Sequence, residues 1–417
     1  MASFSIPLSG LAASSEALDI ISNNLANLNT VGFKDQSANF QDLFYQNYGS
    51  DGAGDPIQVG AGTAVGSVAT NFTNGSMQNT GVSSNAAITG NGFFVTEQAD
   101  GSVEYTRAGN FTVNSAGQLV TTDGQTVMGY PAVNGAVNQG AALSPLLVGN
   151  GQTSPPLATT TMQQQTTLDA SATVGTSYST TMAVYDSLGE SHTLTFNYTM
   201  SAPNTWTYQV TLPAADTGGT GGPTTLATGT MNFDSNGNLT SPTGTLPVNV
   251  TGLADGAANL SIAWSLTDPS GNSLITQVAN SGSTTSSTDQ NGYYSGTLTG
   301  YSIMQDGTID GQFTNGQTQA IGQIALASFA NNQGLQLTGG NSYQSTLASG
   351  AAVIGAANSG GRGTLTGGSV ELSNVDISTE FTNLIVVQRA FEADSRVVTT
   401  FDSVSSSTIN LQASPGN

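Results

Sequence analysis

The sequence contains no cysteine, one histidine and only five basic residues among its 417. Without cysteine the chain forms no disulfide, and a zinc site of the usual Cys/His type is excluded. The 26 acidic residues leave a formal charge of −21. Five cations cannot neutralise a row of phosphates, so we expect no nucleic-acid binding. The same scarcity excludes a polybasic membrane anchor.

Long apolar runs are also missing. No stretch approaches the about eighteen apolar residues that a membrane-spanning helix needs, so we expect no membrane insertion. The N-terminus has no basic residue before Lys34, unlike a cleaved secretory signal peptide. A protein of this kind that leaves the cell would use a route without a cleaved signal. With 37% hydrophobic residues the chain can still bury cores, and its length predicts two to four domains.

The sequence offers no catalytic set. His192 lies in an alternating strand pattern without a nucleophile elbow, which favours a histidine that faces solvent or a hydrogen-bond partner. The glycines of Gly60–Gly66 lack the spacing and the following helix of a phosphate loop. Asp234, and Asp306 with Asp310, have calcium-like spacing, but hairpin turns explain them better. We therefore expect no enzyme, no cofactor and no bound metal.

Heptad patterns mark both ends of the chain and predict two helices. The first begins near Pro7 and stops around Gly32, where glycine supplies a left-handed cap. The second is capped by Asp376 or Ser378 and carries a favourable pair between Glu392 and Arg396. The apolar positions, which we expect to form an assembly interface, are Leu11, Leu18, Ile21, Leu25 and Leu28 in the first helix and Ile377, Leu384, Val387, Phe391, Val398 and Phe401 in the second.

These two stripes are too narrow to form a globular core by themselves. We expect the helices to pair with each other or with other copies of the chain; the alternative is ordinary surface helices on a β-domain. Because short helices are marginal in water, Lys34 is expected to be exposed before assembly.

The middle of the chain has β character. Residues 192–198 and 206–210 alternate apolar with polar side chains, as half-buried strands do. The stretch 146–165 is rich in Pro, Thr and Gln, and 280–291 is rich in Ser and Thr, so both are predicted linkers around a separable domain. The glycines of residues 358–368 predict a hinge before the C-terminal helix.

Several motifs, in the same order along the chain, resemble the family of axial proteins of the bacterial flagellar rod and hook. The N-terminal match covers residues 9–11, 18–34 and 40–45, the β-motifs cover 85–94 and 105–111, and the C-terminal match covers 373–397. The individual residues that match the family motif are Asn24, Asn27, Asn29, Thr30, Gly32, Phe33, Lys34, Arg107, Gln388, Arg389 and Arg396.

The resemblance implies a mixed fold, mainly β with α-helical termini. The terminal helices would form a coiled-coil-like inner domain, with two outer β-domains, the second inserted in the first. The expected domains are 1–33 with 372–417 (inner α-helical assembly domain), 34–70 with 360–371 (connecting segment), 71–145 with 291–359 (β-domain) and 146–290 (inserted outer β-domain).

The resemblance also implies a function. Copies would polymerise into a curved hollow tube, the hook, which acts as a universal joint between rod and filament. Implied partners are other copies, the distal rod, hook-cap and hook–filament junction proteins, and the type III export apparatus; the implied location is extracellular. The large insertion favours a hook member over a distal rod-type member. A β-rich adhesin or a secreted hydrolase remains as an alternative of another class, but neither explains the matched terminal heptads.

Overall fold

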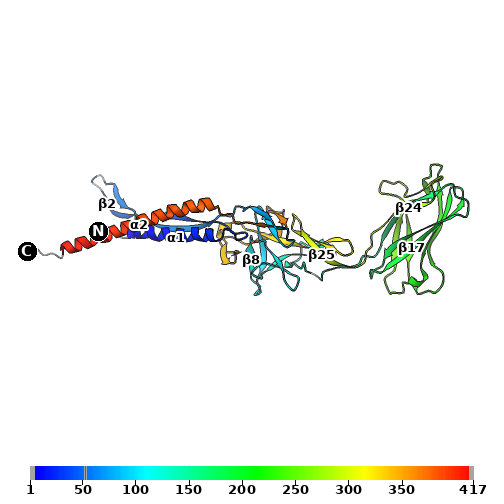
Figure 1. The fold of residues 1–417 in the computed structure, drawn as a ribbon, viewed down its shortest axis with the longest axis horizontal. Helices are drawn as coiled ribbons and strands as arrows, with labels where there is room; N and C mark the ends of the chain where they lie inside the picture. Colours follow the sequence, from blue (N-terminus) through cyan, green and yellow to red (C-terminus); the bar gives the residue numbers. More distant parts are fainter. Residues whose placement is uncertain (1–4, 51, 53, 150, 413–417) are drawn as a thin grey trace, which may run out of the picture. The chain divides into compact units, whose positions relative to one another are not determined.

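A computed structural model describes residues 5–50, 52, 54–149 and 151–412 (Figure 1). The chain divides into two compact units. Unit 1 comprises residues 1–149, 300–311 and 319–417, and unit 2 comprises 150–299 and 312–318. Within the described residues no helix is long and apolar enough to cross a membrane. The fold is mainly β, with one helix near each end of the chain.

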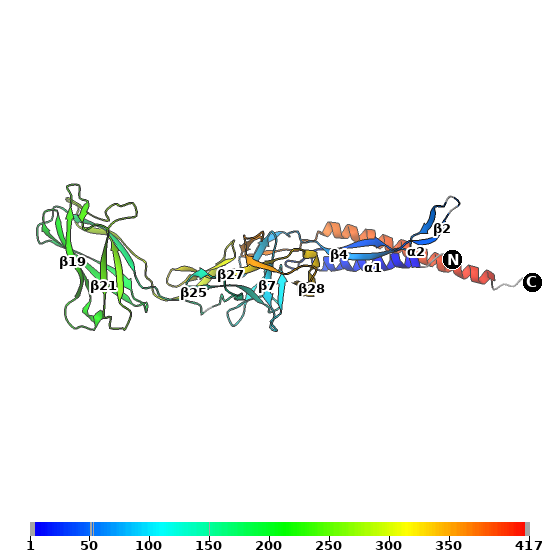
Figure 2. The same ribbon diagram turned by 180° about the vertical axis from the view of Figure 1, so that it is seen from behind.

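The two helices lie side by side in unit 1 and run in opposite directions (Figures 1 and 2). Helix α1 spans Ser5–Ala26 and α2 spans Ile377–Gln412. Asp376 caps α2, since its Oδ1 accepts a hydrogen bond from the Thr379 amide at 2.9 Å. Helix α1 ends before the predicted position: turns follow Ala26, and Gly32 takes a left-handed φ of 70° beyond them.

Short strands connect the helices to the rest of unit 1. Strand β1 (Gln36–Asp42) pairs antiparallel with β4 (Thr63–Thr70), and both contact α1. The other pairs are β2 (Gln46–Ser50) with β3 (Pro56–Val59), β5 (Met77–Asn79) with β32 (Ser369–Glu371), and β6 (Ala86–Thr89) with β31 (Thr364–Gly367). Residues 364–367 and 369–371 therefore pair with strands from the segment 77–89.

The sheet of unit 1, together with the clusters of apolar side chains packed against it, forms what we call the β-body. Its strands lie in the order β27-β11-β7-β8-β29-β28, and β27 and β7 also pair directly. Two buried clusters form the core, one around Phe94 and Phe111, the other around Phe93 and Tyr343. The strands are β7 (Phe93–Glu97), β8 (Val103–Thr106), β9 (Thr112–Val113), β10 (Leu119–Val120), β11 (Thr126–Val133), β12 (Ala136–Val137), β13 (Ser144–Pro145), β27 (Thr318–Ser328), β28 (Gln336–Gly339), β29 (Ser342–Gln344) and β30 (Val353–Ala356), with the 3-10 turn η2 (Asn332–Gly334).

Unit 2 contains two five-stranded sheets that share one core. The first sheet holds β15 (Thr161–Asp169), β21 (Thr245–Val250), β22 (Leu260–Ser265), β23 (Ile275–Val278) and β24 (Thr284–Gln290). The second holds β16 (Ser177–Tyr185), β17 (Ser191–Ala202), β18 (Thr205–Leu212), β19 (Thr224–Phe233) and β20 (Leu239–Ser241), with the 3-10 turn η1 (Ala214–Thr217) after β18.

Trp264 of the first sheet packs edge-on against Phe196 of the second, with ring centroids 5.0 Å apart. Trp206 and Trp264 are both 0% exposed, so the two tryptophans of the chain lie in the core of unit 2. Strand β14 (Thr153–Ser154) pairs with the start of β25 (Gly296–Ile303), and β26 spans Thr308–Phe313.

Two segments that we predicted to be flexible are folded. Strand β24 occupies most of the predicted linker 280–291 and pairs antiparallel with β15, which begins within the other predicted linker. All of its Ser and Thr residues except Thr285 are exposed, so a sequence that looks like a polar linker also suits an edge strand. In the predicted hinge, the Gly363 amide donates to the Asn91 carbonyl at 2.7 Å. A Cβ on Gly363 would lie 2.3 Å from the Thr89 carbonyl oxygen, so this glycine permits close packing rather than movement.

Candidate functional site: the helix pair and its buried ionic anchor

Two contacts fix the alignment of the terminal helices. A Cβ on Gly10 would lie 2.5 Å from Asp394 Oδ2, so α2 passes directly over this glycine. Near the other end of α1, Ala17 and Ile21 line one cavity with Glu380 of α2. The two helices are therefore antiparallel. Because α2 has 36 residues and α1 has 22, the last turns of α2 extend past the described start of α1.

The predicted interface residues are covered to different degrees. Ile21 is buried, at 7% exposure, while Ile377 and Phe391 remain 50% and 38% exposed. The others are half-buried: Leu11, Leu18, Leu25, Leu28, Leu384, Val387, Val398 and Phe401. The α1 positions are therefore better covered within one molecule than the α2 positions.

A second apolar face on α2 was missed from the sequence. It consists of Val386, Val397 and Val404, which are 61%, 43% and 57% exposed. Val386, Val397 and Val404 recur at intervals of eleven and seven, a repeat that keeps them on one side of a helix. A search for one heptad register on a helix does not detect a second apolar stripe on another side of it. We call these three valines the outer face of α2.

Two basic residues, Lys34 and Arg107, meet the carboxylate of Glu371 in the interior of unit 1. We call these three residues the ionic anchor. Lys34 Nζ lies 2.6 Å from Glu371 Oε1, and both side chains are 0% exposed. Arg107 Nη1 lies 3.5 Å from Glu371 Oε2, and its Nη2 donates to the Gly90 carbonyl at 2.9 Å. Burial lowers the pKa of Lys34, while the charge of Glu371 opposes this shift. Lys34 is therefore not the exposed side chain that we expected.

Asn24 is fully buried and connects three segments. Its Nδ2 donates to Asp35 Oδ1 and to the Gln36 carbonyl, both at 2.7 Å, and its Oδ1 accepts from the Gln36 amide at 3.1 Å. Burial raises the pKa of Glu380, with a smaller contribution from the charge of Asp35, and the hydrogen bond from Asn24 opposes this rise. The asparagine thus joins α1, β1 and α2 at one point.

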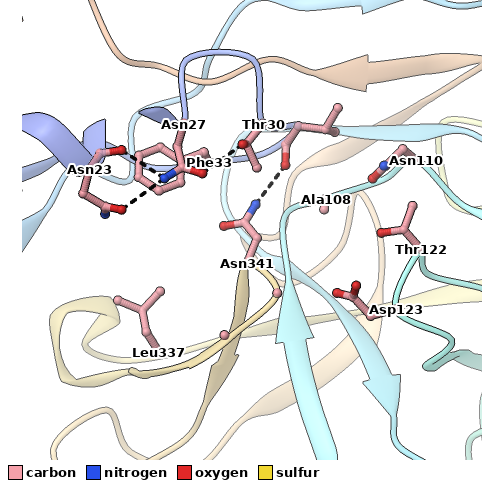
Figure 3. A pocket seen from close by; sticks show the side chains of 13 residues that line it. Asn23, Asn27, Thr30, Phe33, Ala108, Asn110, Thr122, Asp123, Leu337 and Asn341 are labelled. Atoms are coloured by element: carbon pink, nitrogen blue, oxygen red, sulfur yellow. Dashed lines mark hydrogen bonds between the residues drawn. The ribbon is translucent and has the colours of Figure 1, made fainter. Parts of the chain in front are cut away.

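The turn after α1 carries further motif residues around a polar pocket (Figure 3). Asn27 Nδ2 donates to the Asn23 carbonyl at 2.9 Å, and its Oδ1 accepts from Thr30 Oγ1 at 2.9 Å. Asn341, from the β-body, donates to the Val31 carbonyl at 2.8 Å across the pocket, which Phe33 also lines. These side-chain hydrogen bonds hold the turn after α1 against the β-body.

Gly32 occupies a position that excludes any side chain. Besides its φ of 70°, a Cβ there would lie 2.6 Å from the backbone carbon of Arg107. Its amide donates to the Glu371 carbonyl at 2.7 Å. Gly32 therefore allows the backbone after α1 to pack directly against the backbones of Arg107 and Glu371.

The remaining motif residues are on the surface. Asn29, Gln388 and Arg396 are exposed. Arg389 pairs with Glu392 at 3.3 Å, three residues apart, so Glu392 does not make the pair with Arg396 that we predicted.

The comparisons follow the whole chain. Four family models match in order: "Flagella basal body rod protein" at residues 6–34, "Flagellar hook protein FlgE/F/G D1 domain" at 87–166, "Flagellar basal body protein FlaE D2 domain" at 152–293 and "Flagellar basal body rod FlgEFG protein C-terminal" at 366–411. The flagellar hook protein FlgE of Salmonella typhimurium is 37% identical over 98% of this chain and 100% of its own length. The chain belongs to the flagellar hook protein family.

Other hook proteins agree with this assignment. Flagellar hook protein FlgE of Escherichia coli K12 is 35% identical and that of Treponema pallidum 33% identical, over 98% and 97% of this chain and 100% and 98% of their own lengths. The crystal structure of Helicobacter pylori flagellar hook protein FlgE2 superimposes with a TM-score of 0.50 at 16% identity, over 69% of this chain and 98% of its own. That likeness bears on the fold alone. Hook proteins are structural proteins and not an enzyme family.

Proposed function

We propose that this chain is a structural subunit of the flagellar hook, which polymerises through its terminal helices into a curved hollow tube. The observation that carries the proposal is the outer face of α2, an apolar stripe left exposed although α2 already packs on α1. Contiguous exposed apolar surface is a mark of protein–protein contact. A second copy of the same chain offers further exposed apolar side chains, because Ile6 and Leu8 of α1 are 40% and 60% exposed.

Assembly through such faces is cooperative. Burying an apolar side chain contributes about 1.5–3 kcal/mol, and every copy repeats the gain along the tube. The ionic anchor supports this arrangement, because it holds the helix pair on a rigid β-body while the outer face stays free for neighbours. Torque applied at one end of a polymer can then pass through folded units rather than through loose chain.

The outer β-units would make the contacts that change during bending. The edge strand β24 presents exposed Ser and Thr side chains, and polar, hydrated contacts exchange partners at little cost. We therefore propose a universal joint: a cooperative inner tube of helices surrounded by polar contacts that shift as the tube rotates.

The partners and the route are proposals as well. A tube of this kind would join the distal rod proteins at one end and the hook–filament junction proteins at the other, and would grow beneath a hook cap. We propose delivery through the type III export apparatus to the outside of the cell without a cleaved signal. The acidic, cysteine-free composition is compatible with passage in an unfolded state.

The experiment is assembly of the purified chain, followed by electron microscopy. The double variant Val386→Ser, Val397→Ser changes only exposed side chains of the outer face, so the monomer should fold while tube formation is lost. The matched control is Val133→Ser, Val353→Ser, two valines of the β-body that are 63% and 60% exposed. Tubes of normal length from the α2 variant would refute the proposal, whereas loss of tubes in both variants would show that the effect is not specific to α2.

A further inference from the structure

The one histidine of the chain lies in unit 2, surrounded by three aspartates. His192, at the start of β17, has a side chain that is only 6% exposed. Asp186 follows β16, Asp216 lies in η1, and Asp255 lies in the loop between β21 and β22. Four segments from both sheets thus converge on one imidazole.

One aspartate fixes the orientation of the ring. His192 Nδ1 lies 3.1 Å from Asp216 Oδ2, a hydrogen-bond distance. A carboxylate accepts, so in the neutral imidazole that binds a metal ion Nδ1 would carry the proton and Nε2 the lone pair. Metal-binding histidines in proteins have this arrangement, in which the nitrogen away from the metal donates to a carboxylate.

The other ring nitrogen faces two carboxylate oxygens. Nε2 lies 3.4 Å from Asp186 Oδ2 and 3.8 Å from Asp255 Oδ2. All three atoms lie within 4.8 Å of one another. These are long distances for hydrogen bonds, but a tetrahedral zinc ion with bonds of about 2.0–2.1 Å separates its ligand atoms by about 3.3–3.4 Å.

Both carboxylates are held in place by backbone amides. Asp186 Oδ1 accepts from the amides of Leu188 and Glu190, each at 2.8 Å. Asp255 Oδ1 accepts from the Ala257 amide at 2.9 Å. In each aspartate one oxygen is thus occupied and the other, Oδ2, is directed at His192.

Unit 2 has no lysine or arginine to offset this negative charge. All five Lys and Arg residues of the chain lie outside residues 150–299 and 312–318. With three carboxylates against one imidazole, the cluster has an excess of negative charge around the buried side chain of Asp186, which is 0% exposed.

We propose that this cluster binds one divalent metal ion of the zinc class, with His192 Nε2 and the Oδ2 atoms of Asp186 and Asp255 as ligands. Asp216 orients the imidazole, and water completes the coordination on the side where Asp255 is 28% exposed. An imidazole with oxygen ligands suits zinc better than calcium or magnesium. The ion would connect the β21–β22 loop of one sheet to the start of β17 in the other, and so stabilise unit 2.

The test is titration of the full-length chain, first stripped with a chelator, with zinc chloride in a calorimeter. We expect one site per chain. Asp255→Asn should weaken binding at least 100-fold, and Asp216→Asn by 10–100-fold, the usual effect of losing the partner of a metal-bound histidine. Asp289→Asn, at an exposed aspartate elsewhere in unit 2, is the charge-matched control and should bind like the unchanged chain.

Tryptophan fluorescence supplies the second measurement, because Trp206 and Trp264 report the unfolding of unit 2 alone. Zinc should raise the midpoint of this transition in the unchanged chain and in Asp289→Asn, but not in Asp255→Asn. Co²⁺ added in place of zinc should give the intense visible absorption of tetrahedral coordination. Equal zinc affinity in the unchanged chain and Asp255→Asn, or equal loss in Asp289→Asn, would overturn the proposal.

Discussion

Lys34 and Glu371 are 337 positions apart in the sequence, yet their side chains meet at 2.6 Å without solvent exposure. The contact closes unit 1, because one partner directly follows the N-terminal helical region and the other directly precedes the C-terminal helix. Arg107 joins the same carboxylate, so a single acidic side chain balances two buried cations.

Removing Lys34 should destabilise unit 1 selectively. Lys34→Met leaves Glu371 with the hydrogen bond from the Gly75 amide at 2.8 Å and the longer contact to Arg107. Breaking a buried ion pair costs about 3–5 kcal/mol. Urea unfolding followed by circular dichroism at helical wavelengths should show this loss, while the tryptophan transition of unit 2 stays unchanged. The control is Arg389→Met. The side chains of Arg389 and Glu392 are 76% and 54% exposed, so losing their ion pair should change the free energy of unfolding by less than about 0.5 kcal/mol.

The stability of the helix junction should rise as the pH falls from 7 toward 4. The folded-state pKa of Glu380 is raised above its unfolded value, so its favourable contribution is complete at low pH and is lost as the pH rises through the folded pKa. Glu380→Gln should therefore raise the melting temperature of unit 1 at pH 7 and change it little at pH 4. A variant that is equally stabilised at both pH values would show that burial of the charge is not the cause.

Trypsin should cut the monomer first within α2. Arg389 and Arg396 are exposed on a helix whose outer face has no cover within the described chain, whereas Lys34 and Arg107 are 1% exposed. Mass spectrometry of a brief digest should find a large fragment that ends at Arg389 and retains an intact bond after Lys34. Early cleavage after Lys34 would contradict the buried anchor. In assembled tubes, neighbouring copies should slow the cuts in α2.

Gly32→Ala should destabilise unit 1 by more than backbone strain alone. A positive φ costs a non-glycine residue about 1–3 kcal/mol, and here a Cβ would also meet the Arg107 backbone at 2.6 Å. Gly101→Ala separates the two effects, since Gly101 has a φ of 85° but no atom within 4 Å of an added Cβ. If both variants lose the same stability, close packing at Gly32 contributes nothing.

What the sequence predicts depends on how far apart the interacting residues lie. The heptads of the two helices and the hairpin turn at Asp234, whose Oδ1 accepts two nearby amides, are local patterns and are visible in the residues themselves. The partners of Lys34 and Asn24 are not, because side-chain contacts across the fold leave no spacing to recognise. The same is true of His192: its three aspartates are six, 24 and 63 positions away, in separate segments.

The course of the chain through its two units imposes an order on folding. Unit 2 can close once residue 318 is available, whereas the carboxylate that Lys34 needs arrives with Glu371 and the helix that covers Asn24 arrives later still. A chain supplied from its N-terminus therefore holds an unfinished inner unit until nearly all of it is present. A chain that ends before residue 371 leaves Lys34 without the carboxylate of Glu371 and α1 without the packing of α2. Unit 1 is thus completed only when α2 is present.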